Sequence, residues 1–148
     1  KDTGNNRQMI YMASTKINCN KTASEIMQLL SKFGATQILT IFENLEIVGL
    51  SFMINRNGGN LSFKLPIRCQ PVLEAMKKDR HTPNNLCNPE QAKRVAWRQI
   101  LRWIQAQLAL IEIGMVQLEE IFMPYLLIGK DETVYERLIT THFKQIEI

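Results

Sequence analysis

Apolar residues at helical spacing mark one long segment in the second half of the chain. The spacing of three or four residues is carried by Trp97, Ile100, Leu101, Ile104, Leu108 and Ile111. It predicts an amphipathic helix over residues 88–113. Asn88 suits the capping position, Pro89 the first helical position, and Glu90 places an acid in the first turn, where the helix dipole favours it.

Strand patterns precede that helix. Residues 37–42 and 47–55 are rich in Ile, Leu and Phe, and residues 61–65 alternate between apolar and polar side chains. A further run over residues 9–17, which mixes Tyr, Ile and Thr, also predicts a strand. Asn57-Gly58 lies between the second and third of the central strands, and it predicts a hairpin because both turn positions need a positive φ.

Shorter helices are expected over residues 22–33, 71–78 and 134–142. Thr22 and Glu25 have the spacing of a capping box at the start of the first, and Gly34 suits its end. Strands followed by helices predict an α+β fold: an antiparallel sheet of about four strands covered by helices, with one long helix in the C-terminal half. The length predicts a single domain over residues 1–148, with the polar residues 1–8 flexible.

Charge is unevenly distributed along the chain. Residues 64–102 hold nine basic residues against three acidic ones, whereas residues 112–148 hold seven acidic residues against three basic ones. This asymmetry predicts a basic surface formed by the middle of the chain. The alternative is that the acidic C-terminal segment folds back, so that residues such as Glu132 or Glu136 pair with the basic centre.

Three arginines form a second stripe on the long helix. Arg94, Arg98 and Arg102 are four residues apart, so they lie on one face. Arg94 has an acid, Glu90, at helical spacing, but Arg98 and Arg102 have no acid three or four residues away. Their partners must come from elsewhere in the fold or from a ligand. Guanidinium groups bind phosphate through paired hydrogen bonds, which makes a nucleic-acid backbone a candidate ligand.

Two neighbouring features extend this candidate site. Lys77, Lys78 and Arg80 cluster at the end of the short helix, and only a short loop separates them from the long one. Trp103 flanks the apolar stripe, where an exposed indole would stack on a base and contribute about 1–3 kcal/mol. The alternative for Trp103 is a place in the core or in a subunit interface.

Signatures of catalysis and of metal binding are absent from the sequence. It has no glycine-rich phosphate loop, zinc-protease motif or serine-hydrolase motif. Glu119 and Glu120 are adjacent and point in different directions on a helix, which makes a poor acid–base pair. Cys19, Cys69 and Cys87 form no CxxC pair, which favours reduced thiols. We therefore expect no enzyme activity, no cofactor, and no catalytic or metal-binding residue.

Three stretches carry a resemblance to known proteins: STKINCNKTASEI (residues 14–26), LSFKLPI (61–67) and the long segment from RVAWRQ to FMPYL (94–126). Together they resemble a group of small, uncharacterised phage and prophage proteins. The resemblance implies a mobile-element gene product in the cytoplasm of a bacterial host, handling nucleic acid or binding a host protein. The sequence has no apolar window of about 18 residues and no secretory signal, so we expect no membrane contact.

These patterns favour a non-enzymatic nucleic-acid-binding protein that binds the phosphate backbone of single strands. Its expected contacts are Arg94, Arg98, Arg102, Lys77, Lys78, Arg80 and Trp103. The alternative is a protein-interaction module, such as a phage inhibitor of a host defence component or a structural phage subunit, in which the long helix supplies the interface and the arginines pair with acids. A homo-oligomer is compatible with either reading. A third reading is a binder of small anionic nucleotides through the same arginines.

Overall fold

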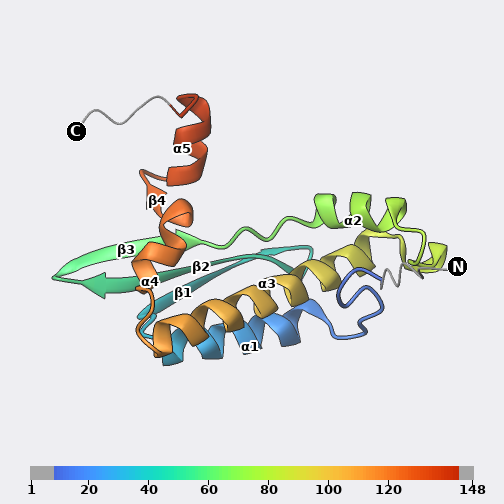
Figure 1. Cartoon of the computed structure of the whole chain (residues 1–148), viewed down its shortest axis with the longest axis horizontal. Helices are drawn as coiled ribbons and strands as arrows, with labels where there is room; N and C mark the ends of the chain where they lie inside the picture. Colours follow the sequence, from blue (N-terminus) through green and yellow to red (C-terminus); the bar gives the residue numbers. More distant parts are fainter. Residues whose placement is uncertain (1–8, 144–148) are drawn as a thin grey trace, which may run out of the picture.

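The computed structural model describes residues 9–143, so the flexibility expected of residues 1–8 lies outside it. Within this range five helices, five strands and two 3-10 turns make an α+β protein, as the sequence predicts (Figure 1). In chain order they are α1 (Cys19–Lys32), β1 (Gln37–Glu43), β2 (Glu46–Arg56), β3 (Gly59–Lys64), α2 (Cys69–Lys78), η1 (Asn84–Leu86), α3 (Pro89–Glu112), α4 (Leu118–Phe122), η2 (Met123–Tyr125), β4 (Leu127–Ile128), β5 (Glu132–Thr133) and α5 (Val134–Thr140).

The long helix α3 matches its prediction closely. The Asn88 side chain accepts a hydrogen bond from the backbone N–H of Gln91 at 2.9 Å, and Pro89 is the first helical residue. Gly114 follows the helix with a φ of +77°. The apolar stripe is buried from Trp97 to Leu108, so the helical periodicity identified the core side of α3.

Helix α1 begins earlier than the capping-box pattern predicts. Its cap is Asn18, whose side chain accepts from the backbone N–H of Lys21 at 2.8 Å. The predicted capping box at Thr22 and Glu25 is wrong, because both residues lie inside the helix. Asn is as good a cap as Thr, and Thr22 is fully buried, which leaves it no role at an exposed helix end. The glycine end is confirmed, since Gly34 has a φ of +108°.

The central sheet is antiparallel, with the strand order β1-β2-β3. The predicted turn between β2 and β3 is confirmed: Asn57 and Gly58 have φ values of +53° and +81°. The turn between β1 and β2 has the same shape, with φ values of +49° at Asn44 and +66° at Leu45. A bulge places Val48 as an extra residue in β2, so β1 itself keeps a regular alternation.

Helices cover only one face of this sheet. Helices α1 and α3 lie side by side beneath it (Figure 1), and their apolar faces share a core with Leu50, Phe52 and Phe63 of the strands. Phe122 of α4 joins that core, and an isolated bridge between Phe63 and Leu126 attaches the C-terminal elements to the β3 edge. Within residues 9–143, the groove on the other face is lined by residues of the strands and of the turn between β4 and β5, and by none of a helix.

The strand predicted over residues 9–17 is wrong. This segment consists of turns and irregular backbone, with Ala13 N–H bonded to the Ile10 carbonyl at 2.9 Å and Thr15 N–H to the Met12 carbonyl at 2.9 Å. Side chains of α3 take the place of a neighbouring strand: the Gln91 side-chain amide donates to the carbonyls of Ala13 and Thr15. The described part of the central sheet therefore has three strands.

Candidate interaction surfaces

Arg94 is held within α3 by a buried glutamine. Its Nε and Nη2 donate to Oε1 of Gln91 at 3.0 and 2.8 Å. Gln91 is only 3% exposed, and its Nε2 donates to the Ala13 and Thr15 carbonyls at 2.8 and 2.9 Å. Arg94 thus completes a polar network that ties residues 9–17 to the helix.

Arg98 finds its acid in α1. Its Nη1 lies 3.0 Å from Oε2 of Glu25 and donates to the Thr22 hydroxyl at 3.3 Å, and the Arg98 side chain is 16% exposed. The alternative that placed its partner in the acidic C-terminal segment is wrong for this residue. In that segment Glu132 pairs with Arg137 at 2.8 Å.

Arg102 is exposed and lies over an aromatic ring. Its guanidinium carbon is 4.3 Å from the centroid of Tyr11, a cation–π distance. The Tyr11 carbonyl also accepts from the Gln99 side chain at 3.0 Å. The arginine stripe and its glutamines therefore hold residues 9–17 and α1 against α3.

Trp103 belongs to an aromatic cluster. Its ring meets Phe122 at 5.4 Å and Tyr125 at 5.6 Å between centroids, edge-on in both cases. Phe122 in turn contacts Phe52 and Phe63. The indole is half-buried and packs against the core. Trp103 therefore takes the place in the core that was the alternative to stacking on a base.

The basic cluster at the end of α2 stays exposed, as does Arg102 of the predicted site. Lys77, Lys78 and Arg80 are all exposed, and within residues 9–143 none of the three forms an ion pair. The nearby Asp79 caps the following loop, accepting from the Thr82 hydroxyl at 2.6 Å and from the backbone N–H of His81. These hydrogen bonds, that from Thr82 foremost, lower the pKa of Asp79.

The half-buried thiols of Cys19 and Cys69 offer little reactivity. Burial raises the pKa of the Cys19 thiol to about 11, with a smaller contribution from the neighbouring Cys69. Burial likewise raises the pKa of Cys69. Both groups are protonated at neutral pH, and the thiolate is the nucleophilic form of cysteine.

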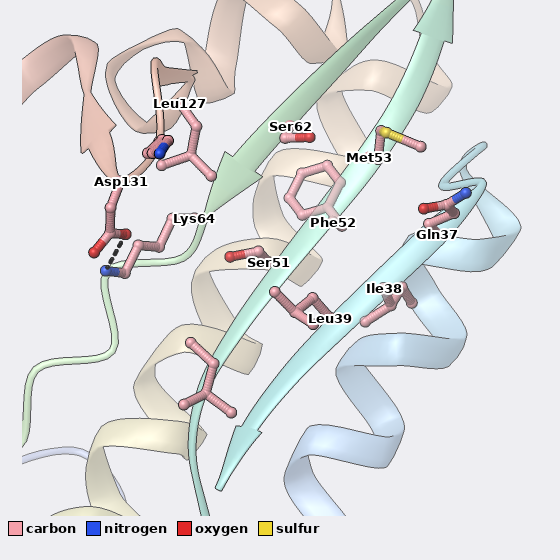
Figure 2. A pocket seen from close by; sticks show the side chains of 12 residues that line it. Gln37, Ile38, Leu39, Ser51, Phe52, Met53, Ser62, Lys64, Leu127 and Asp131 are labelled. Atoms are coloured by element: carbon pink, nitrogen blue, oxygen red, sulfur yellow. Dashed lines mark hydrogen bonds and ion pairs between the residues drawn. The ribbon is translucent and has the colours of Figure 1, made fainter.

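The open face of the sheet holds a groove that sequence reasoning did not predict. It has a volume of about 360 Å³. Figure 2 shows Leu39 of β1, Ser51 and Met53 of β2, and Ser62 of β3 along its floor, with Leu127 at its rim. The turn between β4 and β5 closes one end, where the Asp131 carboxylate lies 3.4 Å from Lys64 Nζ (Figure 2).

Strand β1 forms the other side of this groove and is the free edge of the sheet. Leu39 is 63% exposed, Phe42 56% and Ile41 39%. No described strand pairs with the outer edge of β1. A signal for this surface exists in the sequence: residues 38, 39, 41 and 42 are all apolar, on both faces of one strand. A strand with only one face against a core needs apolar residues at alternate positions only.

Comparison of the chain with protein-family models, with curated proteins and with solved structures finds no match. No described helix has the length and apolar character needed to cross a membrane. The surfaces must therefore be interpreted from their own geometry.

Proposed function

We propose that the chain is a non-enzymatic protein-interaction module that receives an extended segment of another polypeptide along β1. The observation that carries this proposal is the exposure of Leu39 and Phe42 on β1, whose outer edge pairs with no other strand of the described sheet. The free N–H and C=O groups of an edge strand bind a partner strand through ladder hydrogen bonds. Burial of the exposed apolar side chains adds about 25 cal/mol per Å².

The groove beside β1 gives such a segment a place for its side chains. Alternate residues of an added strand point to the same face of the sheet, and pockets on that face select among them. The groove floor is made of small and apolar side chains, Ser51, Met53 and Ser62. Its charged groups, Lys64, Lys130 and Asp131, lie at the end near β4, where Lys64 is paired with Asp131. Away from that end the lining suits uncharged partner residues.

The partner class follows the context that the sequence resemblance implies. We propose that the protein belongs to a phage or mobile element and that the bound segment belongs to a host or phage protein. An inhibitor of a host component and a structural subunit both fit this description. An interface made of apolar contacts and backbone hydrogen bonds changes little with salt concentration.

A photo-cross-linking residue at position 39 tests the proposal. Benzoylphenylalanine replaces Leu39, and the matched control carries it at Ile139, which is 44% exposed on α5. After irradiation in cells, mass spectrometry identifies the attached molecule. We expect position 39 to attach to a polypeptide in far higher yield than position 139. Equal yields at the two positions, or no attached polypeptide, would exclude β1 as a protein-binding edge.

A second candidate, single-stranded nucleic-acid binding, is favoured by the basic cluster at the end of α2. Lys77, Lys78 and Arg80 are exposed without acidic partners in the described part of the chain. Replacing all three with Gln tests it, with fluorescence anisotropy on single-stranded DNA and RNA. If they contact phosphates, the slope of log K against log salt falls by about 0.7 per lost contact. A parent protein that binds neither oligonucleotide at low salt excludes this candidate.

A further inference from the structure

Strand β1 lacks the protection that natural edge strands carry. Edge strands are commonly blunted by lysine, proline or a bulge, which prevents uncontrolled pairing. Residues 38–42 contain no charge and no proline, and the bulge in this hairpin lies in β2. The opposite edge, β3, is partly covered through the bridge between Phe63 and Leu126. An unprotected apolar edge of this kind calls for a specific covering strand.

We infer that the covering strand is β1 of a second copy of this chain, paired antiparallel about Thr40. This inference rests on the proposed protein-binding role of the same edge. A two-fold axis perpendicular to the sheet would join the two three-stranded sheets into one continuous sheet and place the helices of both copies on the same side. Such an isologous contact is the commonest way in which proteins form dimers.

The residues of β1 are self-complementary about Thr40. Opposite residues of an antiparallel pair share a face, and the pairing puts Leu39 opposite Ile41 on the outer face. On the inner face it puts Ile38 opposite Phe42. At each end of the paired region Gln37 meets Glu43, an amide donor opposite a carboxylate acceptor, so no like charges face each other directly.

Neighbouring registers lose this match. A shift of one residue puts outer-face side chains opposite inner-face ones, which a continuous sheet forbids. A shift of two residues places Glu43 opposite Leu39 in one direction and Gln37 opposite Ile41 in the other. Only the register centred on Thr40 pairs apolar residues with apolar residues and polar residues with polar residues along the whole strand.

Charge substitutions on the outer face test both the partner and the register. Leu39→Lys puts two lysines diagonally across the two-fold axis and removes two Leu–Ile pairs, and we expect the dimer dissociation constant to rise by tenfold or more. Adding Ile41→Glu places the introduced lysine of each copy opposite the introduced glutamate of the other, and this double variant should recover the dimer. Ile139→Lys, the same type of change on α5, is the matched control and should leave the dimer intact.

Sedimentation velocity over a range of concentrations measures the association, and thermal unfolding checks that each variant folds. Leu39→Asn replaces the lysine variant if that variant does not fold. Hydrogen exchange on the parent is independent of any variant: within residues 37–43, the alternate amides that point to the free edge should gain protection as concentration rises. If a folded Leu39→Lys protein still forms the dimer, β1 is not the dimer interface. If the double variant stays monomeric, the pairing is not centred on Thr40.

If the parent protein is monomeric at its highest soluble concentration, the strand that covers β1 does not belong to a second copy of this chain. The cross-linking experiment at position 39 then separates the two ideas. Attachment to a different polypeptide retains the proposed protein-binding function without self-pairing, whereas the absence of any attached polypeptide removes both.

Discussion

The face of α3 that meets residues 9–17 and the edge strand β1 differ in what their side chains contact. On α3 the polar groups of Gln91 and Arg98 are bonded to other parts of the same chain, and Arg94 is bonded to Gln91. On β1 the apolar side chains of Leu39 and Phe42 are uncovered. Long polar side chains reach distant partners within a fold, whereas an apolar residue on a sheet edge is covered only when a strand, helix or loop packs directly on that edge. The surface most available to a partner is therefore the less charged one.

The largest effect is expected at Gln91, the centre of the polar network. Gln91→Ala leaves two buried carbonyls without donors and frees Arg94, so we expect a loss of about 2–4 kcal/mol in the free energy of unfolding, measured with urea. The control Gln99→Ala removes a single hydrogen bond, to the Tyr11 carbonyl, which is more exposed than those of Gln91. It should lower the free energy of unfolding by less than about 1 kcal/mol. Equal losses in the two variants would show that Gln91 does not anchor residues 9–17.

The next effect concerns the ion pair of Arg98 with Glu25. Arg98→Gln should lower stability by about 1–2 kcal/mol, less than a fully buried pair because Glu25 is partly solvated. The double variant with Glu25→Gln should lose less than the sum of the single variants in a double-mutant cycle. Coupling to Glu132→Gln in place of Glu25→Gln would instead support the C-terminal pairing that the sequence suggested.

A gain in stability is expected at the turn beside β1. Leu45 is 94% exposed and has a φ of +66°, a conformation that leucine adopts only with strain. Leu45→Gly creates an Asn-Gly turn like that at Asn57-Gly58 and should add about 0.5–1 kcal/mol. The reverse change, Gly58→Leu, should lose about 1–2 kcal/mol. A loss at Leu45 would mean that this side chain is covered in solution.

The smallest effect is expected on β1 itself. Leu39→Thr should change the free energy of unfolding of the monomer by less than about 0.5 kcal/mol, because the side chain packs on little within the chain. The measurement uses dilute protein so that association does not contribute. The same change at the buried Leu50 of β2 should cost about 2–4 kcal/mol. Similar costs at both positions would contradict the contrast between the two regions.

Periodicity and turn chemistry predicted most of the fold because both are local. The buried stripe of α3, its Asn88 cap and the Asn57-Gly58 turn depend on residues close together in the sequence. The same local signals gave a wrong prediction for residues 9–17. Its composition suits a strand, but its carbonyls are bonded by Gln91 and Gln99, more than seventy residues away.

The candidate site was predicted less well for a related reason. The absence of a local acid near Arg98 and Arg102 indicates a partner elsewhere, and the fold supplies Glu25 and Tyr11. The sequence gives no means to distinguish a phosphate from Glu25 or Tyr11, which meet the arginines only after folding. The sequence analysis did not predict the exposed edge at β1, because an apolar strand is usually assigned to a core. Apolar residues on both faces of β1 nevertheless indicate that a second surface, besides the helices, covers this strand.

The buried Gln91 amide also sets an order of events during folding. Its hydrogen bonds to Ala13 and Thr15 span 78 and 76 residues of sequence, so closing them carries the loop-closure entropy of a long chain segment. On the ribosome, residues 9–17 must wait until α3 has emerged before they can dock. Contacts of such sequence separation form late, and φ-value analysis at Gln91 should give a value near zero, with unfolding accelerated and folding unchanged.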